Sequence, residues 1–288
     1  MGHGLYAGSV PARNLFDAAD EQLGFALSTI CFTGPAETLT DTVFQQPALF
    51  VTSLAAWETM CAQAWERPHF MAGHSLGEFT ALTAAGSLTF ADGLRLVQRR
   101  AELMQAAGAA QPGAMAAILA LETAAAAAIC AQATAETGHS VQLANDNCPG
   151  QVVISGHAQA LARALELAQA AGARKLVRLP ISIAAHSALM ASAAAEFAQA
   201  VDNTPIQAPQ IPIIGNVTAQ PLTTADAIRA ELKAQLTAPV AWDASMRYLL
   251  AQDVTRFVEV GPGSVLLGLV KRIARGAQRI PFDTGKEA

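Results

Sequence analysis

Ser75 is the residue of this sequence best placed to do chemistry, because it lies at the centre of Gly73-His74-Ser75-Leu76-Gly77. A G-x-S-x-G sequence between a strand and a helix forces a sharp turn that exposes the serine, since flanking glycines allow backbones to approach closely. The hydroxyl becomes a useful nucleophile when a base removes its proton. Backbone N–H groups at the start of the following helix favour the oxyanion that forms, and the N–H of Leu76 is the candidate donor.

The base should be a histidine elsewhere in the chain, and His186 is the best candidate of six. It follows the apolar segment 181–183, which predicts a strand, and it opens a predicted helix where the chain passes from one predicted unit into another. Binding and catalytic sites often form where two units of a protein meet. His74 adjoins Ser75 but should point elsewhere. The others lie at a chain end, before a strand or in polar loops: His3, His69, His139 and His157.

No carboxylate is clearly marked as the third group that would orient His186, so a backbone carbonyl could serve instead. The downstream acids occupy positions that a solvated helix face or a cap explains, namely Asp202, Asp226, Glu231 and Asp243.

Arg99 and Arg100 lie in a predicted helix with apolar neighbours, so at least one of them should lean toward the apolar side and could meet the substrate. A guanidinium in a pocket can hold a carboxylate by two parallel hydrogen bonds. Such an arginine would select a dicarboxylic half-thioester over a simple acyl chain.

The elements around these residues alternate between helix and strand. Apolar residues at helical spacing predict helices over 15–27 and 46–65, and the serine turn is flanked by a strand at 69–72 and a helix over 78–85. A helix over 91–107 follows. After residue 183 the pattern predicts a helix over 187–201, a strand over 211–216 and a helix over 226–236. A strand over 256–260, a glycine turn and a helix over 265–274 come last.

The segment between these two stretches has its own pattern. It predicts a strand over 114–121, a helix over 123–137, strands over 141–144 and 151–155, a helix over 158–171 and a strand over 175–180. Asn147-Cys148-Pro149-Gly150 supplies turn chemistry, so the middle strands should pair as a hairpin. This βαββαβ order predicts a ferredoxin-like insert over 111–183. The fold class is therefore α/β, with a parallel-sheet, hydrolase-like large subdomain formed by 1–110 and 184–288.

Composition narrows the function classes. The 288 residues are 52% hydrophobic and 14% charged, which predicts a compact globular protein, and the net charge of −5 argues against nucleic-acid binding. The cysteines are scattered without metal-ligand spacing, so we expect neither a disulfide framework nor a metal site. We find no membrane segment and no signal peptide, so we expect the protein to stay in the cytoplasm.

Several segments, in order and over nearly the whole chain, resemble the malonyl-CoA:acyl carrier protein transacylase family. The residues that carry the resemblance are Gly73 to Glu78, Arg100 in Gln-Arg-Arg-Ala-Glu-Leu-Met, Cys148 to Val153, Ala185 to Met190, and Glu259 to Gly263.

The resemblance implies a ping-pong reaction that supplies fatty acid biosynthesis. Ser75 would take malonyl from coenzyme A and pass it to the phosphopantetheine thiol of acyl carrier protein. His186 would be the base, the backbone carbonyl of Gln235 would orient it, and Arg100 would hold the malonyl carboxylate. Leu76 would donate to the oxyanion, and we also place His74 among the substrate-binding residues. We expect no cofactor, a monomer, and partners limited to acyl carrier protein and the coenzyme A thioester.

This sequence departs from the family pattern at two places. Family members open with a strand and a Gly-Gln-Gly-Ser-Gln loop whose glutamine supplies the second oxyanion N–H, whereas Met1 to Leu5 resembles the stretch just after that loop. Loss of one oxyanion donor costs about 3 kcal/mol in a comparable enzyme, and loss of a central strand would expose apolar edges. We therefore expect the start to be misplaced. The second departure is Ala185, where the family often has serine.

Other functions fit parts of the pattern. A serine esterase or thioesterase shares the serine motif, but it usually carries an acid between serine and histidine and a histidine near the C-terminus. The acyltransferase of malonate decarboxylase and a polyketide loading enzyme fit the same fold. A non-catalytic module that docks a carrier protein is a further alternative. A docking surface for acidic acyl carrier protein could come from basic residues: Arg174, Lys175, Arg178, Lys271, Arg272 and Arg275.

Overall fold

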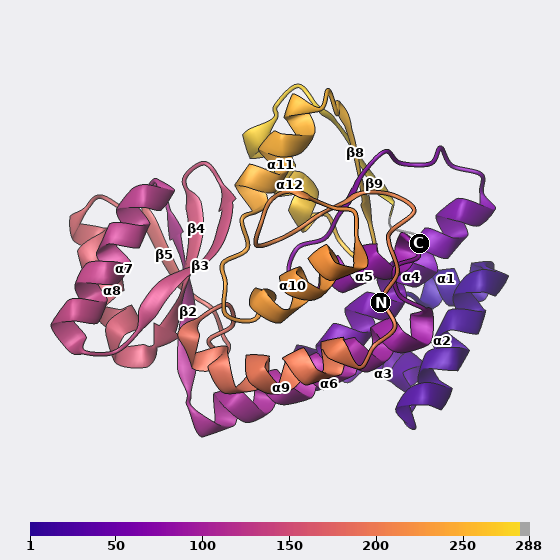
Figure 1. Cartoon of the computed structure of the whole chain (residues 1–288), viewed down its shortest axis with the longest axis horizontal. Helices are drawn as coiled ribbons and strands as arrows, with labels where there is room; N and C mark the ends of the chain where they lie inside the picture. Colours follow the sequence, from indigo (N-terminus) through magenta and orange to yellow (C-terminus); the bar gives the residue numbers. More distant parts are fainter. Residues whose placement is uncertain (283–288) are drawn as a thin grey trace.

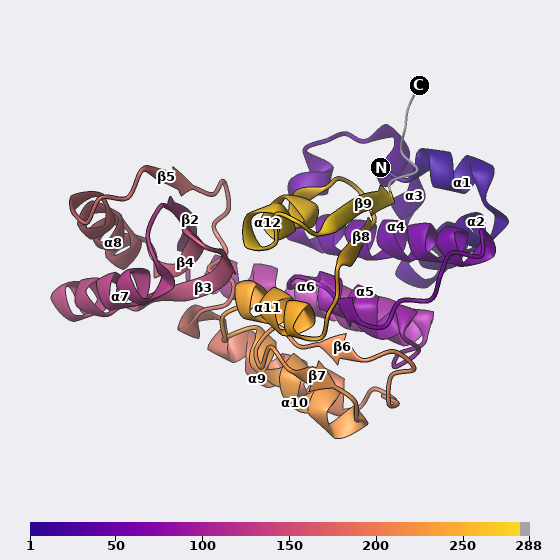
Figure 2. The same cartoon turned by 90° about the horizontal axis from the view of Figure 1, so that it is seen from above.

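The computed structural model describes residues 1–282 and consists of two lobes. Figures 1 and 2 show a small lobe, formed by β2 to β5 with α7 and α8, that projects from a large lobe containing the other elements. No helix within residues 1–282 is both long and apolar enough to span a bilayer.

The large lobe begins with a group of helices. These are α1 (His3–Gly8), α2 (Val10–Leu23), α3 (Leu27–Thr33), the 3-10 helix η1 (Thr38–Thr40) and α4 (Thr42–Ala62). The predicted helix over 15–27 is wrong at its C-terminal end, because Gly24 adopts a left-handed conformation with φ of 74° and ends α2. Phe16 of α2 and Phe50 and Leu54 of α4 lie in the main hydrophobic core.

The serine turn lies between β1 (Met71–Ala72) and α5 (Gly77–Ala84), and the long helix α6 (Phe90–Ala110) follows. β1 pairs in parallel with β6 (Ile213–Ile214), and β6 pairs with the antiparallel strand β7 (Pro221–Leu222). A second, separate sheet contains β8 (Arg256–Val260) and β9 (Gln278–Phe282), which pair in parallel. The predicted strand–turn–helix order is confirmed, but the parallel strands form two small sheets instead of one continuous sheet.

The two sheets turn unpaired edges toward each other. The N–H of Met71 donates to the carbonyl of Pro212, so the backbone polar groups of Met71 point toward β6. Those of its neighbours Phe70 and Ala72 point to the opposite side. Thr255 and Gly261 hydrogen-bond to β9, so the alternate residues of β8 direct their backbone groups away from it.

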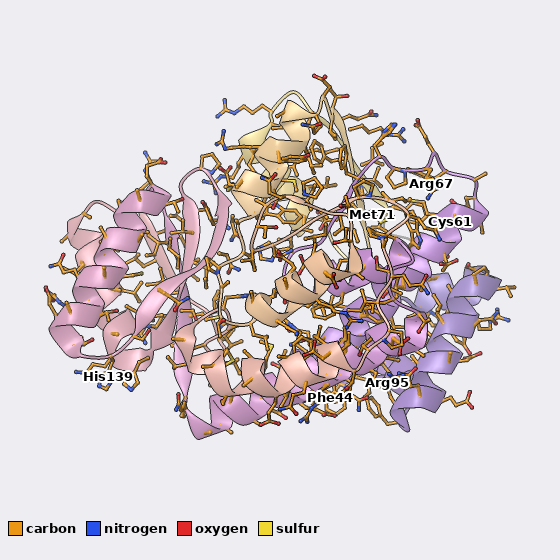
Figure 3. The ribbon with its side chains drawn as sticks, in the orientation of Figure 1. Phe44, Cys61, Arg67, Met71, Arg95 and His139 are labelled. Carbon is orange, nitrogen blue, oxygen red and sulfur yellow. The ribbon has the colours of Figure 1, made fainter. Side chains whose placement is uncertain are left out.

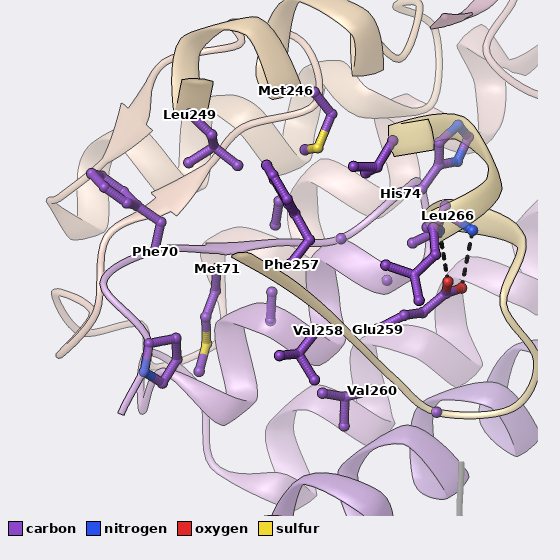
Figure 4. A pocket seen from close by; sticks show the side chains of 18 of the residues that line it. Phe70, Met71, His74, Met246, Leu249, Phe257, Val258, Glu259, Val260 and Leu266 are labelled. Atoms are coloured by element: carbon purple, nitrogen blue, oxygen red, sulfur yellow. Dashed lines mark hydrogen bonds between the residues drawn. The ribbon is translucent and has the colours of Figure 1, made fainter. Parts of the chain in front are cut away.

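A cavity of about 1110 Å³ separates these edges. Figure 4 shows Phe70 and Met71 on the β1 side and Phe257, Val258 and Val260 on the β8 side. Apolar side chains from both edges therefore line this space. The cavity also reaches the backbone of the serine turn at Gly73.

The small lobe has the expected βαββαβ order. Its elements are β2 (Gly113–Leu119), α7 (Thr123–Thr137), β3 (Val141–Cys148), β4 (Gln151–His157), α8 (Ala158–Ala170) and β5 (Lys175–Arg178). The strand order is β3-β4-β2-β5, every neighbouring pair is antiparallel, and β3 and β4 form the predicted hairpin. Alanines of α7 and α8 pack against Ile118 and Ile154 in a separate core.

The remaining helices return the chain to the large lobe. They are the 3-10 helix η2 (Ala188–Met190), α9 (Ala191–Asp202), α10 (Ala225–Gln235), α11 (Trp242–Ala251) and α12 (Val265–Ile273). The predicted strand over 181–183 is wrong. That stretch is irregular, and one backbone bond, from Gly113 N–H to Ser182, ties it to β2. No helix was predicted from the sequence at the position of α11. The architecture confirms the α/β class with a ferredoxin-like insert.

Candidate active site

The serine turn has the sharp geometry that its motif predicts. Ser75 has a φ of 51°, an uncommon conformation for a residue with a side chain. A Cβ at Gly73 would overlap the backbone of Gly77, so glycine is required there, whereas a Cβ at Gly77 would meet open space. The two glycines of the motif therefore have different importance, and Gly73 makes the turn possible.

Ser75 and His186 form a hydrogen-bonded pair. The serine Oγ lies 2.8 Å from His186 Nε2. His186 Nδ1 lies 2.8 Å from the carbonyl of Gln235 and 3.2 Å from that of Ala238. Carbonyls accept hydrogen bonds, so Nδ1 carries the proton and Nε2 is the free acceptor for the serine. This arrangement is that of a base poised to deprotonate a nucleophile.

Burial keeps this imidazole neutral. His186 is 3% exposed, and its pKa is lowered to about 3, first by burial and then by the positive charge of Arg100. The carboxylates considered for its orientation lie elsewhere. Asp202 pairs with Lys233, Asp243 pairs with Arg247, Glu231 accepts from Val217, and Asp226 is exposed.

Arg100 lies against the serine. Its side chain donates to Ser75 Oγ at 3.0 Å, to Gln235 Oε1 at 3.0 Å and to Gln46 Oε1 at 2.7 Å. Burial lowers its pKa to about 10, so it stays charged at neutral pH, while the charge of Glu78 opposes the shift. Its Nε–H is buried and has no acceptor within residues 1–282. Arg99 instead points outward to Glu196.

A network of buried polar side chains hydrogen-bonds to the backbone of the serine turn. This network was not predicted from the sequence. Asn216 accepts the Ser75 N–H at 2.6 Å and donates to the carbonyl of Gly73 at 2.7 Å. The Glu78 carboxylate accepts from the backbone and side chain of Asn216 and from the side chain of Gln235. The signal available was Glu78 itself, an acid directly after the motif in the first turn of a helix.

Glu78 is fully buried, and its pKa is raised to about 8, first by burial and then by the charge of Glu231. Its hydrogen bonds connect Arg100 with the serine turn. Through Gln235 it reaches Arg100, and through Asn216 it reaches the backbone of Ser75.

The other two predicted substrate-contacting residues lie on either side of Ser75. The Leu76 N–H, at the start of α5, has no hydrogen-bond acceptor in the part of the chain that the structure describes. It is therefore available to an oxyanion, whereas the Ser75 N–H is occupied by Asn216. The ring of His74 bonds to Asn147 of β3 at 2.9 Å and packs on Trp242, so it is directed away from the serine.

The remaining histidines do not join the site. Figure 3 shows His139 at the outer edge of the small lobe. Its ring stacks on that of His157, with 3.9 Å between the ring centroids. Among residues 1–282, no group of three or more histidines, cysteines or acids could hold a metal ion.

The fold and the site define an acyltransferase-type enzyme centre, with a serine nucleophile candidate, a neutral histidine and a buried arginine. Residues 1–284 match the family model described as the acyl transferase domain. The chain is 44% identical over 280 residues to the malonyl CoA-acyl carrier protein transacylase of Bacillus subtilis. The aligned region covers 97% of this chain and 88% of the relative. The chain belongs to the malonyl CoA-acyl carrier protein transacylase family.

Solved structures agree with this assignment. The malonyl CoA-acyl carrier protein transacylase of Coxiella burnetii superposes with a TM-score of 0.95 at 38% identity, covering 99% of this chain and 90% of that chain. A malonyl-transacylase in complex with a type II polyketide acyl-carrier protein gives a TM-score of 0.93 at 36% identity, covering 98% and 90%. These matches favour an acyltransferase over the esterase or thioesterase alternative.

Proposed function

We propose that this chain transfers the malonyl group from malonyl-CoA to the phosphopantetheine thiol of acyl carrier protein, and so supplies fatty acid biosynthesis. The observation that carries this proposal is the buried guanidinium of Arg100, 3.0 Å from the hydroxyl of Ser75. A fixed positive charge beside the nucleophile favours an acyl group that ends in a carboxylate.

The first half-reaction acylates Ser75. His186 Nε2 takes the hydroxyl proton while Oγ attacks the thioester carbonyl, and the tetrahedral oxyanion accepts from the Leu76 N–H. The imidazolium that forms keeps its Nδ1 hydrogen bond to Gln235. When the carbon–sulfur bond breaks, the coenzyme A sulfur leaves with the proton from His186, and malonyl-Ser75 remains.

The second half-reaction reverses these steps with another thiol. His186 takes the proton of the phosphopantetheine thiol, whose sulfur attacks the malonyl-serine carbonyl. Collapse of the tetrahedral intermediate returns the proton to Ser75 Oγ and releases malonyl-acyl carrier protein. One base serves both halves because the two thioesters differ only in the group beyond the sulfur.

Arg100 would hold the malonyl carboxylate throughout. Its Nε–H lacks an acceptor in residues 1–282, and its neighbours Gln46 and Gln235 contribute neutral amide oxygens. Gln235 lies between Arg100 and the carboxyl of Glu78, whose raised pKa of about 8 leaves it mostly uncharged at neutral pH. A malonyl carboxylate would therefore supply both a missing acceptor and a direct counter-charge, which an acetyl group cannot do.

A carrier protein of polyketide synthesis is the second candidate acceptor. It is favoured by the similarity to a malonyl-transacylase in complex with a type II polyketide acyl-carrier protein. The acylation chemistry would be the same, and only the surface that receives the carrier would differ. The monomeric state and the cytoplasmic location stay predictions, as does the role of His74 in substrate binding.

Radiolabelled malonyl-CoA tests the proposal. The enzyme should acquire label on the peptide that contains Ser75, and holo-acyl carrier protein added afterwards should remove the label and become malonylated. A fatty-acid carrier and a polyketide carrier, supplied in competition, would identify the preferred acceptor. Label that persists in the Ser75→Ala variant would show that another residue is the nucleophile.

A further inference from the structure

His186 occupies a strained turn that its own segment supports only in part. Its φ is 56°, a left-handed conformation that costs free energy for a residue with a side chain and persists only where the surroundings hold it. The chain before it is irregular, and the Ser187 hydroxyl bonds locally, to Ala184 and Leu189. Further support comes from another part of the molecule.

Gln142, on strand β3 of the small lobe, supplies that support. Its Nε2 donates to the carbonyl of His186 at 3.2 Å and to that of Thr237 at 3.1 Å. Its Oε1 accepts the N–H of Ala188 at 3.1 Å. Two carbonyls need donors and one N–H needs an acceptor, so these three partners define the orientation of the amide.

These bonds connect the base to the groups that orient it. Thr237 lies between Gln235 and Ala238, whose carbonyls accept from the imidazole. The backbone of β3 already holds the same segment, because Val240 exchanges hydrogen bonds of 2.8 and 2.9 Å with Ala144 and Asp146. Strand β3 therefore fixes the orienting carbonyls, and Gln142 fixes the histidine to the same strand.

We propose that Gln142 is a positioning residue that keeps His186 in register with Ser75 and with its orienting carbonyls, and so couples the small lobe to the base. This inference rests on the roles proposed above for Ser75 and His186. It does not depend on the identity of the acyl donor or of the carrier protein.

The test uses a fluorophosphonate, which reacts with an activated serine whatever the natural substrate. We compare the wild type with Gln142→Met, which keeps the length and loses all polar atoms, and with Gln142→Glu, which keeps the shape and loses the donors. Gln132→Ala is the matched control, because Gln132 lies in the same lobe and bonds to exposed Glu136. Ser75→Ala provides the blank.

Both Gln142 variants should react between about 10-fold and 100-fold more slowly at saturating probe, since a small misplacement of a catalytic group has effects of this size. The probe concentration for half-maximal rate should change by less than about twofold, because Gln142 does not line the serine side of the site. Melting curves measured in parallel report whether each variant is folded.

The pH dependence separates positioning from general loosening. The charged or titratable groups that influence His186 are Arg100 and His74, and neither changes in Gln142→Met. Gln142→Glu adds a carboxyl group that would itself raise the pKa of His186, so the pH comparison uses Gln142→Met. A displaced imidazole becomes more hydrated, so its pKa should rise toward the ordinary value, and the rate deficit should be larger at pH 5 than at pH 8.

A Gln142→Met enzyme that reacts like the wild type at both pH values would overturn the proposal. So would an equal slowing in Gln132→Ala. If the wild type reacts with the probe but takes no label from malonyl-CoA, the proposed function fails while the role of Gln142 is still decided by its variants.

Discussion

The site contains two strained turns, one at Ser75 and one at His186, and they are built in different ways. Their side chains meet where Ser75 Oγ lies 2.8 Å from His186 Nε2. The backbone of the serine turn is held by the large lobe, by a glycine that admits no Cβ and by the buried amide of Asn216, and one side-chain bond joins His74 to Asn147 of the small lobe. The histidine turn is held across the lobe boundary, by Gln142 of β3 and by carbonyls at and just after the end of α10. Both turns therefore depend on distant segments, but the strand, turn and helix that carry the nucleophile are contiguous in the sequence, whereas the base needs both lobes.

Removal of the base should produce the largest effect. In His186→Ala the serine keeps its turn but loses its proton acceptor, so acylation by malonyl-CoA should fall by at least about 10⁴-fold. Rapid-quench measurement of malonyl-enzyme formation checks this. A loss of less than about tenfold, in a variant whose melting temperature is unchanged, would mean that another group accepts the serine proton.

Removal of the serine turn's support should have a smaller effect. Asn216→Ala leaves the Ser75 N–H and the Gly73 carbonyl without their partner, so we expect a loss of acylation rate of about 10-fold to 100-fold. The pH profile should keep its shape, because Asn216 does not contact the imidazole. In Gln142→Met, by contrast, the rate should fall more at low pH. If the rate in Asn216→Ala also fell more at low pH than in the wild type, the two turns could not be distinguished in this way.

The smallest expected change concerns pH in the wild type. The neutral imidazole is the base, so activity is lost as pH falls through the pKa of His186, which burial lowers to about 3. The acylation rate should therefore stay nearly constant between pH 8 and pH 5. Circular dichroism at each pH verifies that the enzyme is folded. A half-loss near the ordinary histidine value of 6.5 would show that the site is more hydrated than the structure indicates.

The contrast between the turns also explains what the sequence could predict. The serine turn is a contiguous motif, so its strand, turn and helix could be read directly, as could the hairpin and helices of the small lobe. The pairing of Ser75 with His186 followed from patterns that the structure reproduces. The helical pattern left Arg99 and Arg100 open, and the family resemblance identified Arg100. The carbonyl of Gln235 was identified through the family resemblance.

Other features depend on distant contacts that no local pattern marks. Gln142, Asn216 and Gln46 are ordinary polar residues in sequence, and they matter because the fold brings them to a strained backbone or to Arg100. The division of the large lobe into two sheets depends on strand pairing between β8 and β9. The early end of α2 and the irregular stretch 181–183 were missed because glycine capping and tertiary packing override apolar periodicity.

Whether Arg100 selects malonyl at Ser75 is decided by the ratio of kcat/KM for malonyl-CoA to that for acetyl-CoA. Arg100→Ala and Arg100→Lys are compared with Arg99→Ala, whose parent side chain faces solvent and pairs with Glu196. Arg100→Ala should lower the ratio by about 100-fold, Arg100→Lys, which keeps the charge, should lower it less, and Arg99→Ala should leave it unchanged. An equal loss of malonyl and acetyl transfer in Arg100→Ala would show that Arg100 does not select malonyl.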